Sequence, residues 1–246
     1  LTVSSKIIEA NIYVICVQTP LTVEKEADTS YVFNVLKSLL PLLKSDDCVI
    51  LESTCPVGPT EKLMKIVQES RPEIADQVHW AFCAERFFPG NALEEIVQND
   101  RIIGTMTQTA MSKAHDMYSR FVKGNIHNTS IEVAEMCKLV ENASRDVELA
   151  FSNELSVICS EKNIDVNEVI ELVNKHPRVN VLTPSCGVGG HCIPIDPYFL
   201  FSECSEQNTR FMRMARNIND DKCSWCISKI QKVKNTFARE NKCDPI

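Results

Sequence analysis

The fold is decided by two short apolar runs, Ile12-Tyr-Val-Ile-Cys-Val17 and Cys48-Val-Ile-Leu-Glu52. Both are rich in β-branched residues and lack the alternation of a half-exposed strand, so they predict strands that are buried on both faces of a parallel sheet. Between them, residues 28–43 carry apolar side chains at helical spacing, and Asp28 or Thr29 can cap that helix. A strand, a helix and a second strand indicate the start of an α/β arrangement.

The same alternation continues along the chain, with helices expected at 59–69 and 107–121 and strands at 78–83 and 101–104. Residues 1–129 therefore predict a partial Rossmann-like parallel sheet of the doubly wound type. Such a sheet opens with a Gly-x-Gly-x-x-Gly loop that holds the pyrophosphate of a dinucleotide, and this motif does not occur in the sequence. We therefore expect residues 1–129 to be the C-terminal part of a dinucleotide-binding domain.

The pattern changes near Thr129. Residues 130–162 contain no Gly or Pro, and they predict one helix of about 45 Å at 1.5 Å per residue. Further helices are expected at 165–174 and 210–239, separated by a loop at 180–197 that is rich in Gly and Pro. Residues 130–246 thus predict an all-α domain with a long central helix, and a helix of this length favours dimerisation.

The composition excludes several classes of protein. The 246 residues carry a formal net charge of -7, which argues against a general affinity for nucleic acid or acidic membranes. No apolar run approaches the roughly 18 residues of a membrane span. The 12 cysteines are scattered, and Cys16, Cys48 and Cys83 fall in strand-like runs, which predicts reduced, buried thiols in a cytoplasmic protein. A lone C-x-x-C at Cys223 and Cys226 has no second ligand pair, so we expect no metal site.

The sharpest chemical signal is the segment Cys186-Gly-Val-Gly-Gly-His-Cys192. It holds three of the chain's seven glycines, so its backbone N–H groups can converge on a developing negative charge. Cys192 follows directly, where a thiol is placed for nucleophilic attack, and Asp196 lies four residues further on. The alternative is a flexible loop with an incidental cysteine.

A second group of polar residues lies on the long predicted helix. Lys138, Asn142 and Arg145 are spaced i, i+4 and i+7, which puts an ammonium, an amide and a guanidinium on one helical face. This pattern indicates either a functional cluster or a solvated polar stripe.

Polar residues also follow the predicted strands. Thr19, Thr54 and the segment Glu85-Arg-Phe87 come after three strands, at the carboxyl edge where parallel sheets bind ligands. Further along, His176-Pro-Arg178 indicates either a charged surface loop or an anion clamp.

Six motifs occur in an order that resembles the UDP-glucose/UDP-N-acetyl-D-mannosamine 6-dehydrogenase family. They are Ile15-Cys-Val-Gln-Thr-Pro20, Glu52-Ser-Thr-Cys-Pro-Val-Gly58, Ala84-Glu-Arg-Phe-Phe-Pro-Gly90, Asn99-Asp-Arg-Ile-Ile-Gly104, Lys138-Leu-Val-Glu-Asn142 and Gly187-Val-Gly-Gly-His-Cys192. The segments His176-Pro-Arg-Val-Asn180 and Gly189-Gly-His-Cys-Ile-Pro-Ile-Asp-Pro-Tyr198 are similar to the UDP-N-acetyl-D-mannosamine dehydrogenase branch. The resemblance covers nearly the whole chain and departs from the family pattern at Gln18, Cys55 and Ser185-Cys186.

This resemblance implies an NAD-dependent, two-step oxidation of the 6-hydroxyl of a UDP-N-acetylhexosamine, with UDP-N-acetyl-D-mannosamine as the best candidate, to the uronic acid. Cys192 would capture the aldehyde as a thiohemiacetal and then carry a thioester. Lys138 would exchange a proton or stabilise the oxyanion. Asp196 would orient Lys138 or a water, and Glu85 would help to activate the hydrolytic water.

The resemblance also implies a set of binding residues and a homodimer formed through the helical domain. Thr19 and Thr54 would contact the nicotinamide half of NAD, and Arg178 would reach the substrate across the dimer interface. The sugar nucleotide would be held by Arg86, Phe87, Lys138, Asn142, Arg145, His176, Arg178 and Gly189. The family's C-terminal UDP-binding domain has no counterpart in the sequence. Because the Gly-x-Gly-x-x-Gly loop is also absent, we hypothesise that this chain alone binds NAD weakly and turns nothing over.

Three alternatives stay open. UDP-N-acetylglucosamine or UDP-glucose could be the substrate, because a pocket separates such sugars by only a few kcal/mol. A non-catalytic dimerisation module would explain the long helix, although it would need neither Lys138 nor Cys192. Another NAD-dependent hydroxy-acid or sugar-nucleotide dehydrogenase would have a similar layout without a nucleophilic cysteine.

Overall fold

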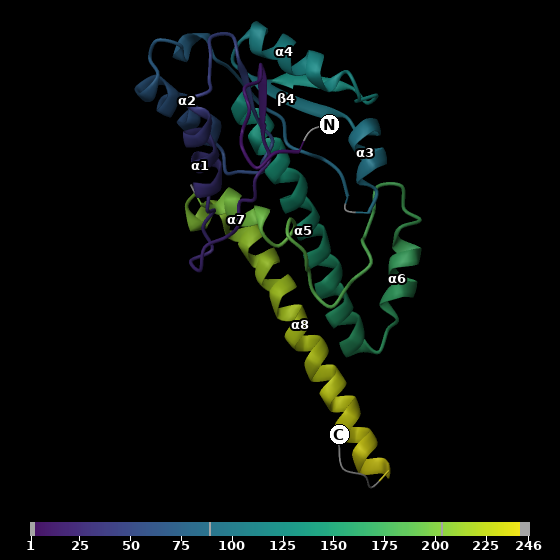
Figure 1. The fold of residues 1–246 in the computed structure, drawn as a ribbon. Helices are drawn as coiled ribbons and strands as arrows, with labels where there is room; N and C mark the ends of the chain where they lie inside the picture. The colour runs from purple at the N-terminus through teal and green to yellow at the C-terminus, as the bar shows by residue number, and fades with distance from the viewer. Residues whose placement is uncertain (1–2, 89, 203, 242–246) are drawn as a thin grey trace. The chain divides into compact units, whose positions relative to one another are not determined.

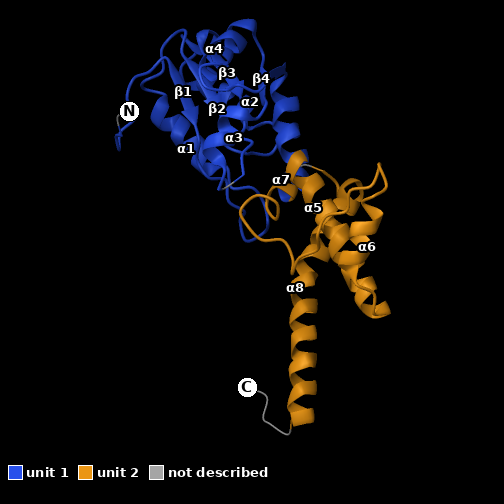
Figure 2. Cartoon of the chain, turned by 90° about the vertical axis from the view of Figure 1, so that its right-hand side faces the viewer, with its two compact units in different colours: residues 1–140, 198–203 blue, residues 141–197, 204–246 orange. Residues whose placement is uncertain are grey.

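The computed structural model of the chain describes residues 3–88, 90–202 and 204–241 (Figure 1). The chain divides into two compact units, Leu1–Val140 with Tyr198–Glu203 and Glu141–Pro197 with Cys204–Ile246 (Figure 2), hereafter the first and the second unit. One helix, α5 (Ile131–Lys162), runs from the first unit into the second.

The first unit is built on a sheet in which five described strands follow one another in chain order. The strands are β1 (Ile12–Ile15), β2 (Cys48–Leu51), β3 (His79–Phe82), β4 (Arg101–Thr105) and β5 (Ile126–Thr129). Neighbouring strands pair in parallel except for β3 and β4, which are antiparallel. The predicted α/β class with a Rossmann-like sheet and a long central helix is confirmed.

The antiparallel pair corrects the expectation that the sheet is parallel throughout. Between β3 and β4 lies only the short helix α3 (Ala92–Gln98). A parallel crossover carries the chain back along the whole length of the strands, usually as a helix. Seven helical residues cover only about 10 Å at 1.5 Å per residue, so β4 begins near the edge where β3 ends and runs back beside it.

Two apolar cores lie on opposite faces of the sheet, because successive strand side chains alternate between faces. Helices α1 (Ser30–Leu39) and α2 (Pro59–Ser70) cover one face, where Val49 and Leu51 point. Helix α4 (Gln108–Tyr118) covers the other face (Figure 1). Cys48 and Ile50 pack on this face, against Met111 and Ala114 of α4. All four residues of β2 are buried, as its unbroken apolar run predicts.

Strand β1 differs from this prediction. Tyr13 and Ile15 are buried, but Val14 is 38% exposed and Cys16 is also exposed. Among the described residues β1 is an edge strand, paired on one side only, and one of its faces is not covered. The expectation of a buried Cys16 is therefore wrong, whereas Cys48 and Cys83 are buried as predicted.

The second unit consists of helices around a buried polar network. It contains the larger part of α5, helix α6 (Val166–Val173), the start of α7 (Asp196–Phe201) and α8 (Glu206–Asn241). Asp146 of α5 pairs with Arg216 of α8, and both side chains are almost completely buried. Asn153 of α5 donates to Asn219 of α8 at 2.8 Å. These bonds tie the two longest described helices together.

The long helix predicted over 130–162 is confirmed, whereas several shorter elements were not predicted. Strand β5, helices α3 and α7, and the 3-10 turn Ala75–Gln77 have no separate signal in the sequence, and α8 begins four residues earlier than expected. In the part of the chain that the structure describes, no helix is both long and apolar enough to cross a lipid bilayer.

Candidate active site

Two of the predicted catalytic residues meet in the first unit. Lys138 projects from α5 with only 10% of its side chain exposed, and its Nζ donates to the Glu85 carbonyl at 2.7 Å and to Glu85 Oε1 at 3.2 Å. The other carboxylate oxygen of Glu85 accepts from the backbone N–H of Phe87 at 3.0 Å. The backbone after β3 therefore fixes the carboxylate, and the carboxylate fixes the ammonium.

The two predicted cofactor contacts also meet, at the carboxyl ends of β1 and β2. The Thr19 hydroxyl donates to the Thr54 carbonyl at 2.6 Å, and both residues are half-buried. Ser53, between β2 and Thr54, accepts from the backbone N–H of Val17 at 2.8 Å, which joins the two strand ends a second time. These two hydrogen bonds fix the backbone at the carboxyl ends of β1 and β2.

Arg86 and Phe87 continue the same loop after β3. The guanidinium of Arg86 donates to the Asp100 carbonyl at 3.0 Å, and its own carbonyl accepts from Asn99 Nδ2 at 2.6 Å. Both Arg86 and Phe87 are half-buried. Arg86 is thus held against the start of β4, and its side chain borders the same strand ends as Glu85.

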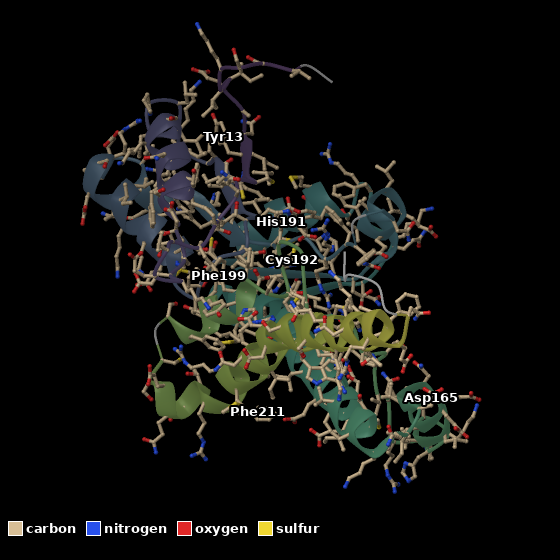
Figure 3. All side chains as sticks on the ribbon, turned by 90° about the horizontal axis from the view of Figure 1, so that it is seen from below. Tyr13, Asp165, His191, Cys192, Phe199 and Phe211 are labelled. Atoms are coloured by element: carbon tan, nitrogen blue, oxygen red, sulfur yellow. The ribbon has the colours of Figure 1, made fainter. Side chains whose placement is uncertain are left out.

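In the second unit, the predicted Asn142 and Asp196 meet. Asn142 Nδ2 donates to Asp196 Oδ2 at 2.5 Å, and Asp196 is 4% exposed. The backbone N–H groups of Ile195 and Asp196 donate to the Cys192 carbonyl at 3.0 Å and 2.9 Å, which forms the turn into α7. Cys192 is exposed and follows His191 on the loop (Figure 3), so the turn joins the candidate nucleophile to a buried carboxylate.

Two of the three glycines before Cys192 adopt backbone angles that favour glycine. Gly187 and Gly190 have φ angles of +127° and +101°, a region that other residues rarely adopt. A Cβ at position 187 would also lie 3.0 Å from the Cys223 sulfur of α8. Gly187 is therefore required twice, by its backbone angle and by its close approach to α8. By contrast, a Cβ at Gly189 would meet nothing within 4 Å.

The start of this loop is anchored to the buried polar network. The backbone N–H of Ser185 donates to Asn153 Oδ1 at 2.8 Å, and its hydroxyl donates to the Gly187 carbonyl at 2.6 Å. Cys223 donates to the Cys186 carbonyl at 2.9 Å. The thiol of Cys223, in the C-x-x-C motif, thus holds the backbone of the loop. No group of three His, Cys, Asp or Glu residues suited to a metal ion lies among residues 3–88, 90–202 and 204–241.

The remaining predicted binding residues of the second unit lie on its surface. Arg145 is exposed on α5, and His176 and Arg178 are exposed after α6. The Arg178 backbone N–H donates to the His176 ring nitrogen Nδ1 at 3.3 Å, which shapes a turn between the two side chains. The structure thus brings these two residues together.

Three cysteines of the first unit have raised pKa values. Partial desolvation of the thiol, together with the Glu52 carboxylate, raises the pKa of Cys16 to about 12. Burial raises the pKa of Cys48 and of Cys83 to about 11. These three side chains are therefore neutral thiols near pH 7, and a thiolate is the reactive form of cysteine.

The sequence patterns did not single out two carboxylates, Glu135 and Asp146, which are fully buried on α5. A signal was present in the sequence. The buried stripe of α5 runs through Ile131, Ala134, Leu139 and Ala143, and the charged residues fall on it at helical spacing. A carboxylate on an apolar stripe needs a buried partner, which periodicity alone does not identify.

Comparison with known families decides which proteins this chain resembles. Residues 1–122 match the NAD binding domain of the UDP-glucose/GDP-mannose dehydrogenase family, and residues 132–221 match the central domain of the same family. The chain belongs to this family. Its resemblance to nucleotide-sugar dehydrogenases, first indicated by six short motifs, is confirmed.

Curated relatives within the family share more than two fifths of their aligned residues with the chain. It is 44% identical over 232 residues to UDP-N-acetyl-D-mannosamine dehydrogenase of Escherichia coli (strain K12), covering 91% of the chain and 55% of that protein. It is 42% identical over 236 residues to NDP-N-acetyl-D-galactosaminuronic acid dehydrogenase of Ralstonia solanacearum, covering 93% and 56%. The chain spans about half the length of the curated relatives it matches.

Solved structures show the same fold. UDP-N-acetyl-D-mannosamine dehydrogenase from Pyrococcus horikoshii superposes with a TM-score of 0.86 at 35% identity, over 96% of this chain and 55% of that one. The native UDP-N-acetyl-mannosamine dehydrogenase from Staphylococcus aureus gives 0.84 at 36% identity, over 96% and 56%. The family fold therefore extends over nearly the whole chain.

Proposed function

We propose that this chain carries catalytic machinery of an NAD-dependent dehydrogenase that oxidises the 6-hydroxyl of UDP-N-acetyl-D-mannosamine to the uronic acid in two steps. The observation that carries the proposal is the placement of Lys138 against Glu85 in the first unit. Residues 1–129 would serve as part of the cofactor domain, and residues 130–246 as the helical domain with Lys138 and Cys192. Family membership and the names of the relatives support the reaction class.

Lys138 is suited to donate a hydrogen bond to the oxygen on the reacting carbon. An ammonium has three N–H donors, and two of them are directed at Glu85, which leaves one for a substrate oxygen. With its side chain only 10% exposed, Lys138 acts at low dielectric, where an ammonium stabilises a developing alkoxide strongly. The same group would take up or release the hydroxyl proton.

Cys192 would hold the aldehyde between the two steps. Its thiolate attacks the aldehyde carbon and forms a thiohemiacetal, and removal of the second hydride leaves a thioester. Water then attacks the thioester carbonyl, the C–S bond breaks, and the carboxylate and the thiolate separate. Glu85 would activate this water, and Asp196, at the end of the turn that begins at Cys192, would orient it or Lys138. The reduced thiol that this route needs fits a cytoplasmic location.

NAD, when bound, accepts the hydride in each of the two oxidations. Thr19 and Thr54 would hold its nicotinamide end at the carboxyl edge of β1 and β2, where their mutual hydrogen bond fixes the backbone. The sequence has no Gly-x-Gly-x-x-Gly for the pyrophosphate, so the residues present fit one half of the cofactor.

The sugar nucleotide and a second copy of the chain complete the proposal. We assign substrate contacts to Arg86, Phe87, Lys138, Asn142, Arg145, His176, Arg178 and Gly189. An exposed apolar stripe along α5 includes Val133, Met136, Val140, Phe151 and Ile158, which supports a homodimer formed through the helical domain. Arg178 would then act across that interface.

The test is NADH production with UDP-N-acetylmannosamine, UDP-N-acetylglucosamine and UDP-glucose offered in parallel. It is run on the chain alone and on the chain extended at both ends with the corresponding segments of the Escherichia coli relative. We expect two NADH per UDP-N-acetylmannosamine from the extended protein, and none after Cys192→Ala. Cys186→Ala, at an exposed cysteine of the same loop, is the matched control and should keep activity.

Each outcome has a distinct meaning. Two NADH from a different sugar would keep the mechanism and replace the substrate. One NADH per sugar, unaffected by Cys192→Ala, would favour a single-step dehydrogenase. A folded extended protein that binds NAD and oxidises none of the sugars would overturn the proposal and favour a dimerisation module.

A further inference from the structure

Glu135 has the most completely satisfied buried carboxylate of the first unit. It lies on α5 three residues before Lys138 and is fully buried. Its Oε2 accepts from the backbone N–H of Gly58 at 2.7 Å. Its Oε1 accepts from the Thr60 hydroxyl at 2.6 Å and from the Thr60 backbone N–H at 3.3 Å. None of these bonds is used by the mechanism proposed above.

The three donors belong to the beginning of α2. The N-cap residue of α2 is Gly58, which has no side chain to cap the helix, and its φ of +107° places it in the left-handed region. Free N–H groups at a helix start need acceptors, and their partial positive charge favours an anion. Glu135, 75 residues away in the chain, supplies that acceptor. Burial raises the pKa of Glu135, although the bonds from Thr60 and Gly58 partly offset the rise.

The segment between β2 and α2 is therefore held at both of its ends. Thr54 is fixed by the hydroxyl of Thr19, and Gly58 is fixed by Glu135. A pocket of about 420 Å³ borders Gly58 and Glu135 and is also lined by Met64 of α2 and by Met106. Cys55 inside the segment is buried, so the hydrogen bonds to Glu135 act together with side-chain packing to keep this end of the segment in place.

We propose that Glu135 is a positioning residue that fastens the Thr54–Gly58 segment to the turn of α5 that carries Lys138. Glu135 and Lys138 point from the same side of the helix, because residues three apart are neighbours on a helix surface. One binds the segment after β2, and the other binds Glu85 after β3. The two strand ends are thereby set at a fixed distance from one helix. The consequence for catalysis rests on the function proposed above, whereas the mechanical claim does not.

Cys55 makes the claim measurable, because it lies inside the fastened segment and is 1% exposed. We would follow alkylation of each cysteine by iodoacetamide with mass spectrometry in the native chain. Glu135→Gln keeps the shape and removes the charge, and hydrogen bonds to ionised groups are about twice as strong as neutral ones. We expect Cys55 to react roughly tenfold faster in this variant, which corresponds to about 1.4 kcal/mol. Glu154→Gln, at an exposed carboxylate further along α5, is the control and should leave the Cys55 rate unchanged.

The cysteines of the sheet separate local opening from unfolding. Cys48 and Cys83 are fully buried in β2 and after β3, and they should stay protected while Cys55 reacts. If all three accelerate together in Glu135→Gln, the milder Thr60→Val, which removes only one of the three donors, decides the question. Selective acceleration at Cys55 in either variant supports the proposal, and an unchanged or uniformly changed Cys55 rate in both overturns it.

The catalytic consequence has its own readout. In the extended protein, Glu135→Gln should lower kcat for NADH production while the KM for the sugar nucleotide stays within about twofold, since an interaction made only in the transition state acts on kcat. Faster alkylation of Cys55 in Glu135→Gln together with an unchanged kcat would refute the role of Glu135 in positioning the catalytic groups. If the unsubstituted protein makes no NADH, the proposed function fails, and the alkylation rates still decide whether Glu135 fastens the segment.

Discussion

The buried ion pair of Asp146 and Arg216 gives a prediction whose size follows from the structure. Both side chains are at most 2% exposed, and Asp146 also accepts from Asn219 Nδ2 at 2.8 Å. Arg216 has a second partner, Asp220, at 3.2 Å, which is 50% exposed. Burial raises the pKa of Asp146, and the attraction of Arg216 offsets only part of that rise. The pair itself therefore adds little stability, but either partner left alone is strongly unfavourable.

The expected magnitudes differ between the two acidic partners. Removing one member of a buried pair costs about 3–5 kcal/mol, because it leaves an uncompensated charge. Asp220 remains beside Arg216, and a half-exposed pair contributes about 0–1 kcal/mol, so we expect Asp146→Ala to cost about 3 kcal/mol. Asp220→Asn, the matched control on the same guanidinium, should cost less than about 1 kcal/mol. The double variant Asp146→Ala/Arg216→Met should cost about 1 kcal/mol, since it leaves no buried charge.

Urea unfolding of the second unit measures these differences. The chain has two tryptophans, and in a Trp80→Phe background the fluorescence of Trp225, on α8, reports this unit alone. Two results would refute the reasoning. One is an Asp146→Ala variant that is no less stable than Asp220→Asn, and the other is a double variant whose loss equals the sum of its two single losses.

Two further predictions concern the first unit. Gly104→Ala should lower the free energy of unfolding by about 1–3 kcal/mol through overpacking, because its Cβ would lie 2.7 Å from both the Ile131 Cα and the Ala134 Cβ; a thermal midpoint equal to that of the unchanged chain would contradict this. The hydrogen bond from His127 holds the pKa of Asp100 below its ordinary value, so this carboxylate contributes stability above its unfolded pKa of about 3.9 and loses that contribution as the pH falls through the folded value. Thermal midpoints measured from pH 5 to 2.5 should therefore fall less steeply in Asp100→Asn than in the unchanged chain. Parallel curves for the two proteins would contradict this contribution of Asp100.

In the candidate site, the residue types could be predicted from the sequence, whereas their partners became visible only in the structure. The residue types at Lys138, Cys192 and Asp196 were readable from spacing, since a helical face and a glycine-rich loop are local patterns. Their partners were not readable, because Lys138 meets Glu85 across 53 residues and Asn142 meets Asp196 across 54. Periodicity indicates which face of a helix is buried, and it does not indicate which distant group that face meets.

By itself the sequence determined the positions of the first strands, the long helix and the loop before Cys192, because each depends on side-chain periodicity or on glycine within a short window. Only the tertiary structure decided that β4 runs antiparallel to β3 and that the polar segment Ile126–Thr129 is a strand, since backbone pairing with a distant neighbour makes both. The tertiary structure also decided that Glu135 caps a helix 75 residues away. A buried carboxylate is stable only where donors converge on it, and those donors are brought together by the fold.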